Sequence, residues 1–329
     1  MNLLNLLEPC HKNPQNILYV YAGERLNIQK YVGAVSRVFE GRNVCVVKRF
    51  WDELGESFPN VWARDIELSE PLGLHDAEAF KTLLRDGAWD LILLQGIKPI
   101  IHEPFNHFRL FPYLYDYRKT VDICYLAADF GCSRINDMIE QWREPVRLVD
   151  AGFTMDFPGF MSGRELAWLR RMALERPPHT DIVEIGRYYG QSTIALAHGL
   201  KQSGPGKLYS IDPCLQDGFY ERLAQFGLFD CVEAWNLLSK AAYDRWLLEK
   251  PGETIGMLFI DGDHTYENVY LDIALWSRLL VPDGIIALDD YCEDYDGALL
   301  AINELVFWSG DYYEIQGKGK LTFARKKKA

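Results

Sequence analysis

Acidic side chains follow several apolar runs in the second half of the 329-residue chain. Asp212 follows the run 207–211, Asp261 follows the run 257–260, and the pair Asp289-Asp290 follows the run 285–288. A fourth run contains Glu184 and enters a glycine turn at Gly186. In an open α/β sheet, ligands bind outside the carboxyl ends of the strands. We therefore expect these acids and the glycine turn to converge on one edge of a sheet.

The glycine turn differs from the one that holds a nicotinamide dinucleotide. That fingerprint is G-x-G-x-x-G, with the pyrophosphate at a helix N-terminus. Here the spacing is E-x-G-x-x-x-G from Glu184 to Gly190, without a second glycine close to Gly186. The carboxylates at the same edge would repel a pyrophosphate, whereas they suit a cationic cofactor.

Four motifs occur in the order, and at the strand ends, that are typical of one family. They are EIGRYYGQS (184–192), SIDP (210–213), FIDGDHTYENV (259–269) and LDDY (288–291). Through them, residues 160–325 resemble class I S-adenosylmethionine-dependent methyltransferases. More narrowly, they resemble the metal-dependent sugar O-methyltransferases of the macrocin and novobiocin type, a group that includes the so-called cephalosporin hydroxylases. Residues 1–150 lie outside the resemblance.

The resemblance implies a binding site for S-adenosylmethionine. The residues implied as its floor, beside the methionine part, are Glu184, Gly186, Gly190 and Ser192. Asp212 is implied as the acceptor of hydrogen bonds from the ribose hydroxyls. A carboxylate suits a vicinal diol because it offers two acceptor oxygens.

The resemblance also implies a divalent-metal site, with Asp261, Asp289 and Asp290 as ligands of Mg²⁺ or another divalent cation. Hard cations take oxygen ligands. So many carboxylates at one edge need a compensating cation, or some of them must take up protons. Asp263 is implied as the general base and His264 as the runner-up. The metal would bind two neighbouring substrate oxygens and lower a hydroxyl pKa, so that the alkoxide attacks the sulfonium methyl.

Plainer interpretations of the same residues exist. The turn that begins at Asp261 could be only polar, and Asp289 with Asp290 could cap the next helix. Arg187 stands where the family often has a small residue, and we expect it not to touch a proposed ligand. The stretch 232–239 falls where the family contacts adenine, but its sequence is not typical, so the adenine contacts stay unassigned.

The elements that must position these residues alternate between strand and helix. Strands are expected at 181–186, 207–212, 257–261 and 285–290, and the last two at 312–315 and 321–324. Helices are expected at 192–200 and 266–280, and Ser162 with Glu165 forms a capping box at the start of an earlier helix. This order predicts an α/β fold: a Rossmann-like, doubly wound methyltransferase domain with a parallel sheet.

The first half is predicted to be a smaller α/β domain. Its strands are expected at 17–22, 44–47, 90–95, 126–130 and 146–149, and its helices at 28–39 and 77–84. Residues 99–118 are expected to form an irregular excursion or lid. His102 and His107 in that segment are expected to be surface or packing residues. We place the boundary so that 1–150 is an accessory or substrate-recognition domain of unknown role and 151–329 is the methyltransferase domain.

Composition and charge limit the classes of partner that the protein could bind. Hydrophobic residues make up 48% of the chain and charged residues 25%, as in an ordinary globular protein. The net charge of −12 speaks against nucleic acid, whose phosphates it would repel. The chain lacks a long apolar run and a basic, signal-like start, and its seven scattered cysteines include no C-x-x-C pair. We therefore expect a reduced cytoplasmic protein that does not enter membranes.

The function indicated is an S-adenosylmethionine-dependent, divalent-metal-assisted O-methyltransferase. Its acceptor would be a hydroxyl of a sugar or glycosylated metabolite, that is, a small molecule or glycan. Relatives often assemble, so a homo-oligomer is one expectation. Two alternatives remain: a catalytically degenerate binding or scaffold module, and a hydroxylase. The hydroxylase needs two histidines and a carboxylate together, and only His264 lies at the acidic edge.

Overall fold

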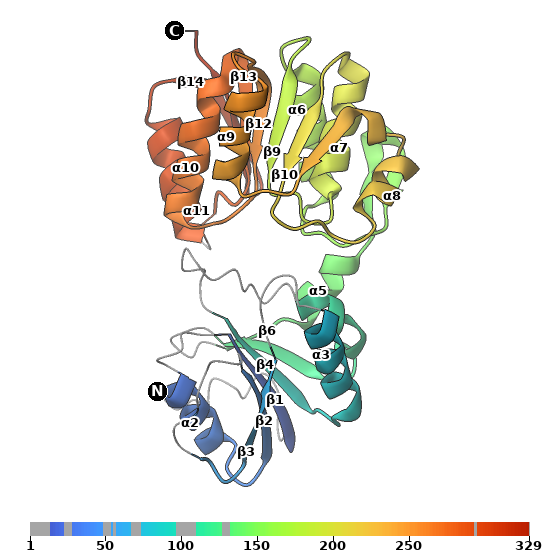
Figure 1. The fold of residues 1–329 in the computed structure, drawn as a ribbon, viewed down its shortest axis with the longest axis vertical. Coiled ribbons are helices and arrows are strands. Elements are labelled where there is room, and N and C mark those ends of the chain that lie inside the picture. Colours follow the sequence, from blue (N-terminus) through green and yellow to red (C-terminus); the bar gives the residue numbers. More distant parts are fainter. Residues whose placement is uncertain are drawn as a thin grey trace. The chain divides into compact units, whose positions relative to one another are not determined.

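The computed structural model describes residues 14–22, 28–48, 54, 57–66, 74–96, 110–126, 132–292 and 295–328. The chain divides into two compact units, Met1–Trp142 (unit 1) and Arg143–Ala329 (unit 2). This division precedes the boundary that the sequence indicated at residues 150–151. Each unit contains its own twisted sheet flanked by helices (Figure 1).

Unit 1 is built on a six-stranded sheet among its described residues, in the order β3-β2-β1-β4-β5-β6. Its strands are β1 (Asn16–Ala22), β2 (Asn43–Lys48), β3 (Val61–Asp65), β4 (Leu91–Gly96), β5 (Asp122–Leu126) and β6 (Cys132–Arg134). All pairings are parallel except that of β5 with β6. The inner strands are continuous apolar runs because helices cover both faces of a parallel sheet.

The helices of unit 1 are α2 (Ile28–Val38), α3 (Leu74–Asp86), α4 (Phe111–Leu114), the 3₁₀ turn η3 (Tyr115–Tyr117) and α5 (Asn136–Arg143). The expected strands at 17–22, 44–47 and 90–95 and both expected helices are confirmed within a few residues. The described part of β5 reaches Leu126, and the rest of the strand expected at 126–130 lies outside the described residues. In the expected excursion at 99–118, residues 110–117 are helical, and His102 and His107 lie outside the described residues.

Unit 2 contains a seven-stranded sheet in the order β11-β10-β9-β12-β13-β15-β14. Its strands are β9 (Asp181–Ile185), β10 (Leu208–Ile211), β11 (Val232–Trp235), β12 (Ile255–Ile260), β13 (Leu280–Leu288), β14 (Tyr312–Lys318) and β15 (Leu321–Lys326). The first five are parallel, as expected. The expectation of a fully parallel sheet is wrong at one edge, because β15 runs antiparallel to β13 and forms a hairpin with β14. A short hairpin connection can join only antiparallel neighbours.

Helices cover both faces of this sheet (Figure 1). They are α6 (Gly163–Glu175), α7 (Gln191–Ser203), α8 (Phe219–Gln225), α9 (Ser239–Glu249), α10 (Tyr266–Trp276) and α11 (Asp296–Ile302), followed by the π-helical turn η8 (Asn303–Phe307). The short turns η4 (Val149–Ala151), η5 (Phe229–Cys231) and η6 (Ser277–Leu279) and the hairpin β7 (Val146–Leu148)–β8 (Phe153–Met155) complete the unit. Along β12, Met257 and Phe259 pack in the core with α6 and α7, whereas Leu258 and Ile260 pack with α9 to α11. The doubly wound Rossmann-like fold is therefore confirmed.

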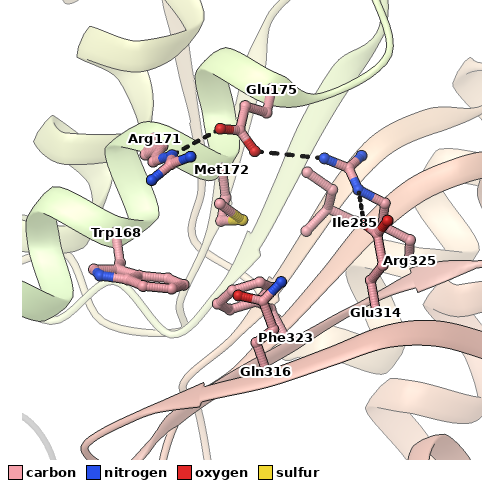
Figure 2. A pocket seen from close by; sticks show the side chains of 9 residues that line it. All are labelled: Trp168, Arg171, Met172, Glu175, Ile285, Glu314, Gln316, Phe323 and Arg325. Atoms are coloured by element: carbon pink, nitrogen blue, oxygen red, sulfur yellow. Dashed lines mark hydrogen bonds and ion pairs between the residues drawn. The ribbon is translucent and has the colours of Figure 1, made fainter.

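Helix α6 packs against the antiparallel hairpin of β14 and β15. It begins with the expected capping box, in which Ser162 and Glu165 exchange hydrogen bonds. Figure 2 shows the side of α6 that faces β15, where Trp168 packs on Phe323 with ring centroids 4.9 Å apart. The side chains drawn in Figure 2 line a pocket. None of the predicted site residues, all of which are described, belongs to its lining.

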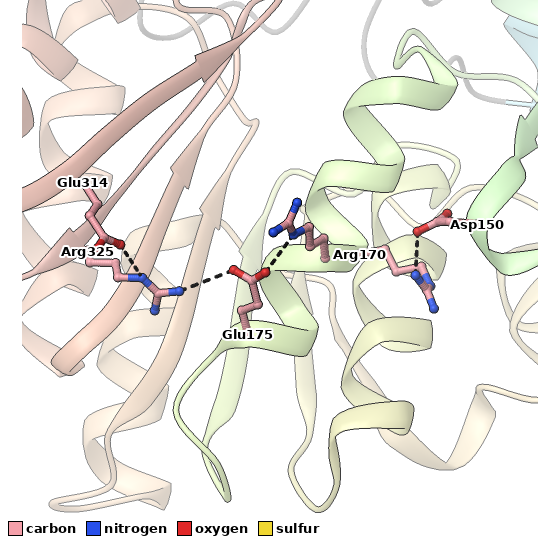
Figure 3. Close-up of polar contacts among 6 residues, drawn as sticks. Asp150, Arg170, Glu175, Glu314 and Arg325 are labelled. Carbon is pink, nitrogen blue, oxygen red and sulfur yellow. Dashed lines mark hydrogen bonds and ion pairs between the residues drawn. The ribbon is translucent and has the colours of Figure 1, made fainter.

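A chain of charges continues this contact (Figure 3). Glu175 of α6 pairs with Arg171 at 2.7 Å and with Arg325 of β15 at 3.5 Å, and Arg325 pairs with Glu314 of β14 at 3.1 Å. The pairs are partly exposed, so their contribution to stability is small and depends on salt. They connect the hairpin to α6 in addition to the ring contact. No helix among the described residues is long and apolar enough to cross a membrane.

Candidate active site

The order of the strands in unit 2 reverses between β9 and β12. The chain runs outward from β9 to β11 and then crosses to β12 on the other side, and such a switch point is where open α/β sheets bind ligands. The loops after the two strands touch there. Gly186 has a φ of 86°, and a Cβ atom on it would lie 1.8 Å from the carbonyl oxygen of Asp261. Only glycine fits this approach, so the glycine turn and the first acid meet as the sequence indicated.

Asp212 is held by the backbone of the glycine loop. Its Oδ2 accepts hydrogen bonds from the N–H groups of Arg187 and Tyr188, both at 3.0 Å, and its Oδ1 accepts one from the N–H of Cys214 at 2.8 Å. Tyr188 has a φ of 46°, a conformation that costs energy in a bulky residue and recurs at functional sites. A carboxylate offers about four lone pairs, so Asp212 retains capacity for a ligand hydroxyl.

Glu184 is completely buried and bonded to three hydroxyls. Its Oε1 accepts from Ser192 at 2.6 Å, and its Oε2 accepts from Thr193 at 2.7 Å and from Ser210 at 2.6 Å. Burial raises the pKa of Glu184, although the hydroxyls and the charge of Arg187 act in the opposite direction. Glu184 and Ser192 therefore bond to each other and join β9 to the start of α7. Thr193 and Ser210 belong to the same cluster and were not singled out from the sequence.

Gly190 forms the N-cap of α7 in a left-handed conformation, with a φ of 93°. A Cβ atom there would lie 2.9 Å from the ring of Phe219. Glycine thus lets helix α8 pack against the loop that holds Asp212. The predicted cofactor residues of unit 2 form one connected set, and their contact with a ligand stays a prediction.

Arg187 is a functional candidate that the sequence reasoning missed. It was not expected to touch a proposed ligand, yet it contacts a predicted cofactor residue: its N–H group bonds Asp212, and its buried guanidinium reaches the Asp212 carbonyl at 3.4 Å. The guanidinium also donates to the Ser210 carbonyl at 2.8 Å and to Asn236 Oδ1 at 2.6 Å, and it lies over the ring of Phe219. Burial lowers the pKa of Arg187. The signal in the sequence was a single basic residue in an otherwise acidic edge.

The remaining acids line a small pocket at the ends of β12 and β13. Its polar lining consists of Asp261, Asp263, His264, Asp289 and Asp290. One ligand atom from each of Asp261, His264 and Asp290 lies within 4.8 Å of the others. Asp290 has a φ of 60°, again a strained conformation for a residue other than glycine. The residues predicted as base and metal ligands thus line one pocket, and the three that come close enough to share one ion are Asp261, His264 and Asp290. Their roles stay a prediction.

A lysine, Lys320, enters this cluster from the turn between β14 and β15. Its Nζ lies 2.8 Å from Asp289 Oδ2 and 2.9 Å from Asp290 Oδ1. The other oxygen of Asp290 lies 2.6 Å from His264 Nε2. Asp263 Oδ1 accepts the backbone N–H of Thr265 at 2.6 Å, just before α10. The cluster therefore already contains one cation supplied by the chain.

The carboxyl groups of the cluster differ in their affinity for protons. Burial, followed by the charges of Asp289 and Asp290, raises the pKa of Asp261 well above its ordinary value. Burial also raises the pKa of Asp289, to about 6, against the charge of Lys320. Burial acts in the same direction on Asp290, but the hydrogen bond from His264 and the charges of His264 and Lys320 outweigh it and lower the pKa of Asp290. Crowded carboxyls of this kind need protons or cations.

The donor set fits a divalent cation. The ligand atoms of two carboxylates and one imidazole lie close enough together to hold one ion. In addition, neither oxygen of the buried Asp289 makes a hydrogen bond within the described part of the chain, although Oδ2 forms the ion pair with Lys320. Two histidines and a carboxylate do not come together among the described residues. His198 accepts a hydrogen bond from Arg170 on α6, and only His264 joins the acids. This arrangement does not favour the hydroxylase alternative.

Three known proteins that are similar to this chain show low identity or partial coverage. An uncharacterised protein of Acanthamoeba polyphaga mimivirus is 30% identical over 132 residues, which are 38% of this chain and 58% of that protein. The O-methyltransferase from Bacillus cereus in complex with SAH is 20% identical, with a TM-score of 0.42, over 51% of this chain and 83% of that one. A TDP-rhamnose 3′-O-methyltransferase of calicheamicin biosynthesis is 17% identical, with a TM-score of 0.41, over 49% and 77%. Likeness at this level carries no information on substrate or metal.

The family comparison covers the site itself. Residues 183–291 match the model of a methyltransferase domain. The match spans every predicted site residue from Glu184 to Asp290, and it ends before the hairpin that carries Lys320. The segment of unit 2 that holds the candidate site is therefore similar to a methyltransferase domain.

Proposed function

We propose that the protein is an S-adenosylmethionine-dependent O-methyltransferase assisted by a divalent cation, with a sugar or glycosylated metabolite as its acceptor. The observation that carries the proposal is the edge of unit 2, where the glycine loop and Asp212 lie beside the acid pocket, inside the methyltransferase match. The acceptor class comes from the sequence resemblance alone.

The residues of this edge would have different roles in cofactor binding. Asp212 would bind the ribose, since its three backbone hydrogen bonds fix its orientation and leave acceptor capacity. The buried Glu184 would act as a support that holds the loop in shape, so its hydroxyl partners matter as much as its charge. The concentration of carboxylates would favour a sulfonium cation over a phosphorylated ligand.

Asp261 and Asp290, with Asp289 or His264, would hold a divalent cation. When bound, S-adenosylmethionine supplies the methyl group and the cation lowers the pKa of a hydroxyl. Asp263 is the proposed base, because it lines the same pocket while His264 is engaged with Asp290. His264 is the second candidate, since a carboxylate that orients an imidazole is a common basic pair.

Turnover separates this proposal from a degenerate scaffold. The protein should form S-adenosylhomocysteine when it is offered S-adenosylmethionine, Mg²⁺ and a panel of sugar nucleotides and glycosylated metabolites. Asp263→Asn should reduce turnover by about 10²-fold or more while S-adenosylhomocysteine binding is kept. Cofactor binding without turnover across the panel would support the scaffold, and equal turnover of Asp263→Asn and wild type would exclude Asp263 as the base.

A further inference from the structure

Lys320 lies where a divalent cation would have to compete for carboxylate oxygens. Its Nζ contacts Asp289 at 2.8 Å and Asp290 at 2.9 Å. Both carboxylates are almost fully buried, whereas 29% of the lysine side chain is exposed. The ammonium therefore pairs with two buried acids, while part of the lysine side chain stays exposed.

The backbone fixes Lys320 beside these acids. The N–H of Tyr291, the residue after Asp290, donates to the carbonyl oxygen of Lys320 at 2.8 Å. The preceding residue, Gly319, turns with a φ of 64°, and a Cβ atom on it would lie 2.8 Å from the side chain of Glu165 on α6. The next residue, Leu321, is buried in the core of unit 2. The position of the lysine at the acid pocket is therefore part of the fold.

An ammonium and a divalent cation need the same oxygens. One oxygen of Asp290 faces Lys320 and the other faces His264, while Oδ2 of Asp289 also faces Lys320. A cation placed among Asp261, His264 and Asp290 would meet the positive charge of the lysine at close range, where repulsion in a partly buried site is strong. The flexible four-carbon stem of a lysine allows the ammonium to withdraw toward solvent.

We propose that Lys320 is a built-in competitor for the divalent-cation site, which pairs with Asp289 and Asp290 until a cation displaces its ammonium. The inference rests on the metal part of the proposed function and not on methyl transfer. The site thereby has a threshold: without a metal the lysine offsets part of its negative charge, and the site takes up a metal only where the free cation is abundant enough to displace the lysine.

Direct titration of the full-length protein with Mn²⁺, followed by calorimetry, tests the competition. Lys320→Gln keeps a polar side chain but removes the charge, so it should bind Mn²⁺ about tenfold more tightly than wild type or better. Lys320→Arg keeps the charge and should show no gain. Lys318→Gln removes a charge from the same hairpin, where the side chain lies 5.8 Å over the ring of Trp168, and should bind as wild type does. Unchanged or weaker binding by Lys320→Gln would overturn the proposal.

A second measurement uses the wild-type protein, in case Lys320→Gln does not fold. Amine-reactive labelling read by mass spectrometry should show that Lys320 becomes more reactive as Mn²⁺ is added, whereas Lys318 does not change. Constant reactivity of Lys320 up to the highest soluble Mn²⁺ concentration contradicts the displacement. Asp261→Asn in the Lys320→Gln background should lose the gain in affinity, and retention of the gain would place the cation elsewhere and overturn the assignment.

Failure of this inference is distinguishable from failure of the proposed function. If Lys320→Gln shows no gain while the protein still binds S-adenosylhomocysteine and turns over S-adenosylmethionine, the competitor role is wrong and methyl transfer stands. If Lys320→Gln gains affinity for Mn²⁺ but no variant binds S-adenosylhomocysteine, the competitor role stands and the proposed function fails.

Discussion

Units 1 and 2 contain the same strand connectivity and differ in the residues at the strand ends. The order β3-β2-β1-β4-β5 of unit 1 repeats as β11-β10-β9-β12-β13 in unit 2, with all neighbours parallel in both. In unit 2 the strands lead into Gly186, Asp212, Asp261 and Asp289. In unit 1 the switch-point strands β1 and β4 end at Ala22 and Gly96. The comparison teaches that the sheet supplies an edge, and the residues after the strands supply the chemistry.

Glycine substitutions give the largest expected difference between the units. Gly186→Ala places a Cβ 1.8 Å from the Asp261 carbonyl in a left-handed conformation, so unit 2 should lose roughly 4 kcal/mol or more, or fail to fold. Gly41→Ala in unit 1 has the same handedness, with a φ of 75°, but no atom within 4 Å, so only about 1–2 kcal/mol is expected. Hydrogen exchange of β9 and β1 amides, read by mass spectrometry, measures each unit separately. Equal losses in the two variants would show that the contact at the switch point is not tight.

The hydroxyl cluster around Glu184 should give a smaller effect. Glu184→Ala leaves the hydroxyls of Ser192, Thr193 and Ser210 without their acceptor in a buried site, which should cost about 3 kcal/mol. In unit 1 the matching change is Gln95→Ala, which removes one acceptor from the Tyr19 hydroxyl and should cost about 1 kcal/mol. Urea unfolding combined with hydrogen exchange compares the two. If Glu184→Ala loses no more free energy of unfolding than Gln95→Ala, the hydroxyl cluster around Glu184 does not hold the glycine loop in place.

A pH-dependent effect should be the smallest and confined to unit 2. Burial raises the pKa of Asp272 on α10 to about 7, from an ordinary value of 3.8. The folded state then binds the proton more tightly than the unfolded state, so stability is fully present below pH 3.8 and falls as the pH rises toward 7. Asp272→Asn should remove the part of the slope that Asp272 contributes and raise stability at pH 8 by on the order of 2 kcal/mol. Urea midpoints at about pH 4 and about pH 8 check it, and a less stable variant at the higher pH would show that the charged carboxylate is needed.

Much of unit 2 could be predicted from the sequence because local signals agreed. Apolar runs such as 257–260 ended in acids or glycines, and Ser162 with Glu165 marked a helix start. The strand β3 of unit 1 was missed, because it is an exposed edge strand in which Arg64 and Asp65 interrupt the apolar pattern. In unit 2, the antiparallel direction of β15 was also missed. The short hairpin connection between β14 and β15 decides this direction, and hydrophobic periodicity does not reveal it.

The candidate site was only partly predictable for a related reason. Residues in one motif or at one strand end, such as Asp261 and Asp290, converge by topology alone. Lys320 comes from the antiparallel hairpin, and its approach to the acids depends on the turn at Gly319 and the backbone bond to Tyr291. Arg187 was visible as a departure from the family pattern, but its guanidinium contacts depend on the packing of the neighbouring strand ends. Such contacts between distant segments leave no local signal.

Cofactor binding at the edge of unit 2 is the central claim, and calorimetric titration with S-adenosylhomocysteine tests it most directly. Wild type should bind, and Asp212→Ala should weaken binding by about tenfold to a hundredfold, because charged hydrogen bonds to the ribose are lost. Asp65→Ala, which removes the acid at the end of β3 in unit 1, is the matched control and should bind as wild type does. Absence of binding by wild type, or equal binding by Asp212→Ala and wild type, would contradict the account.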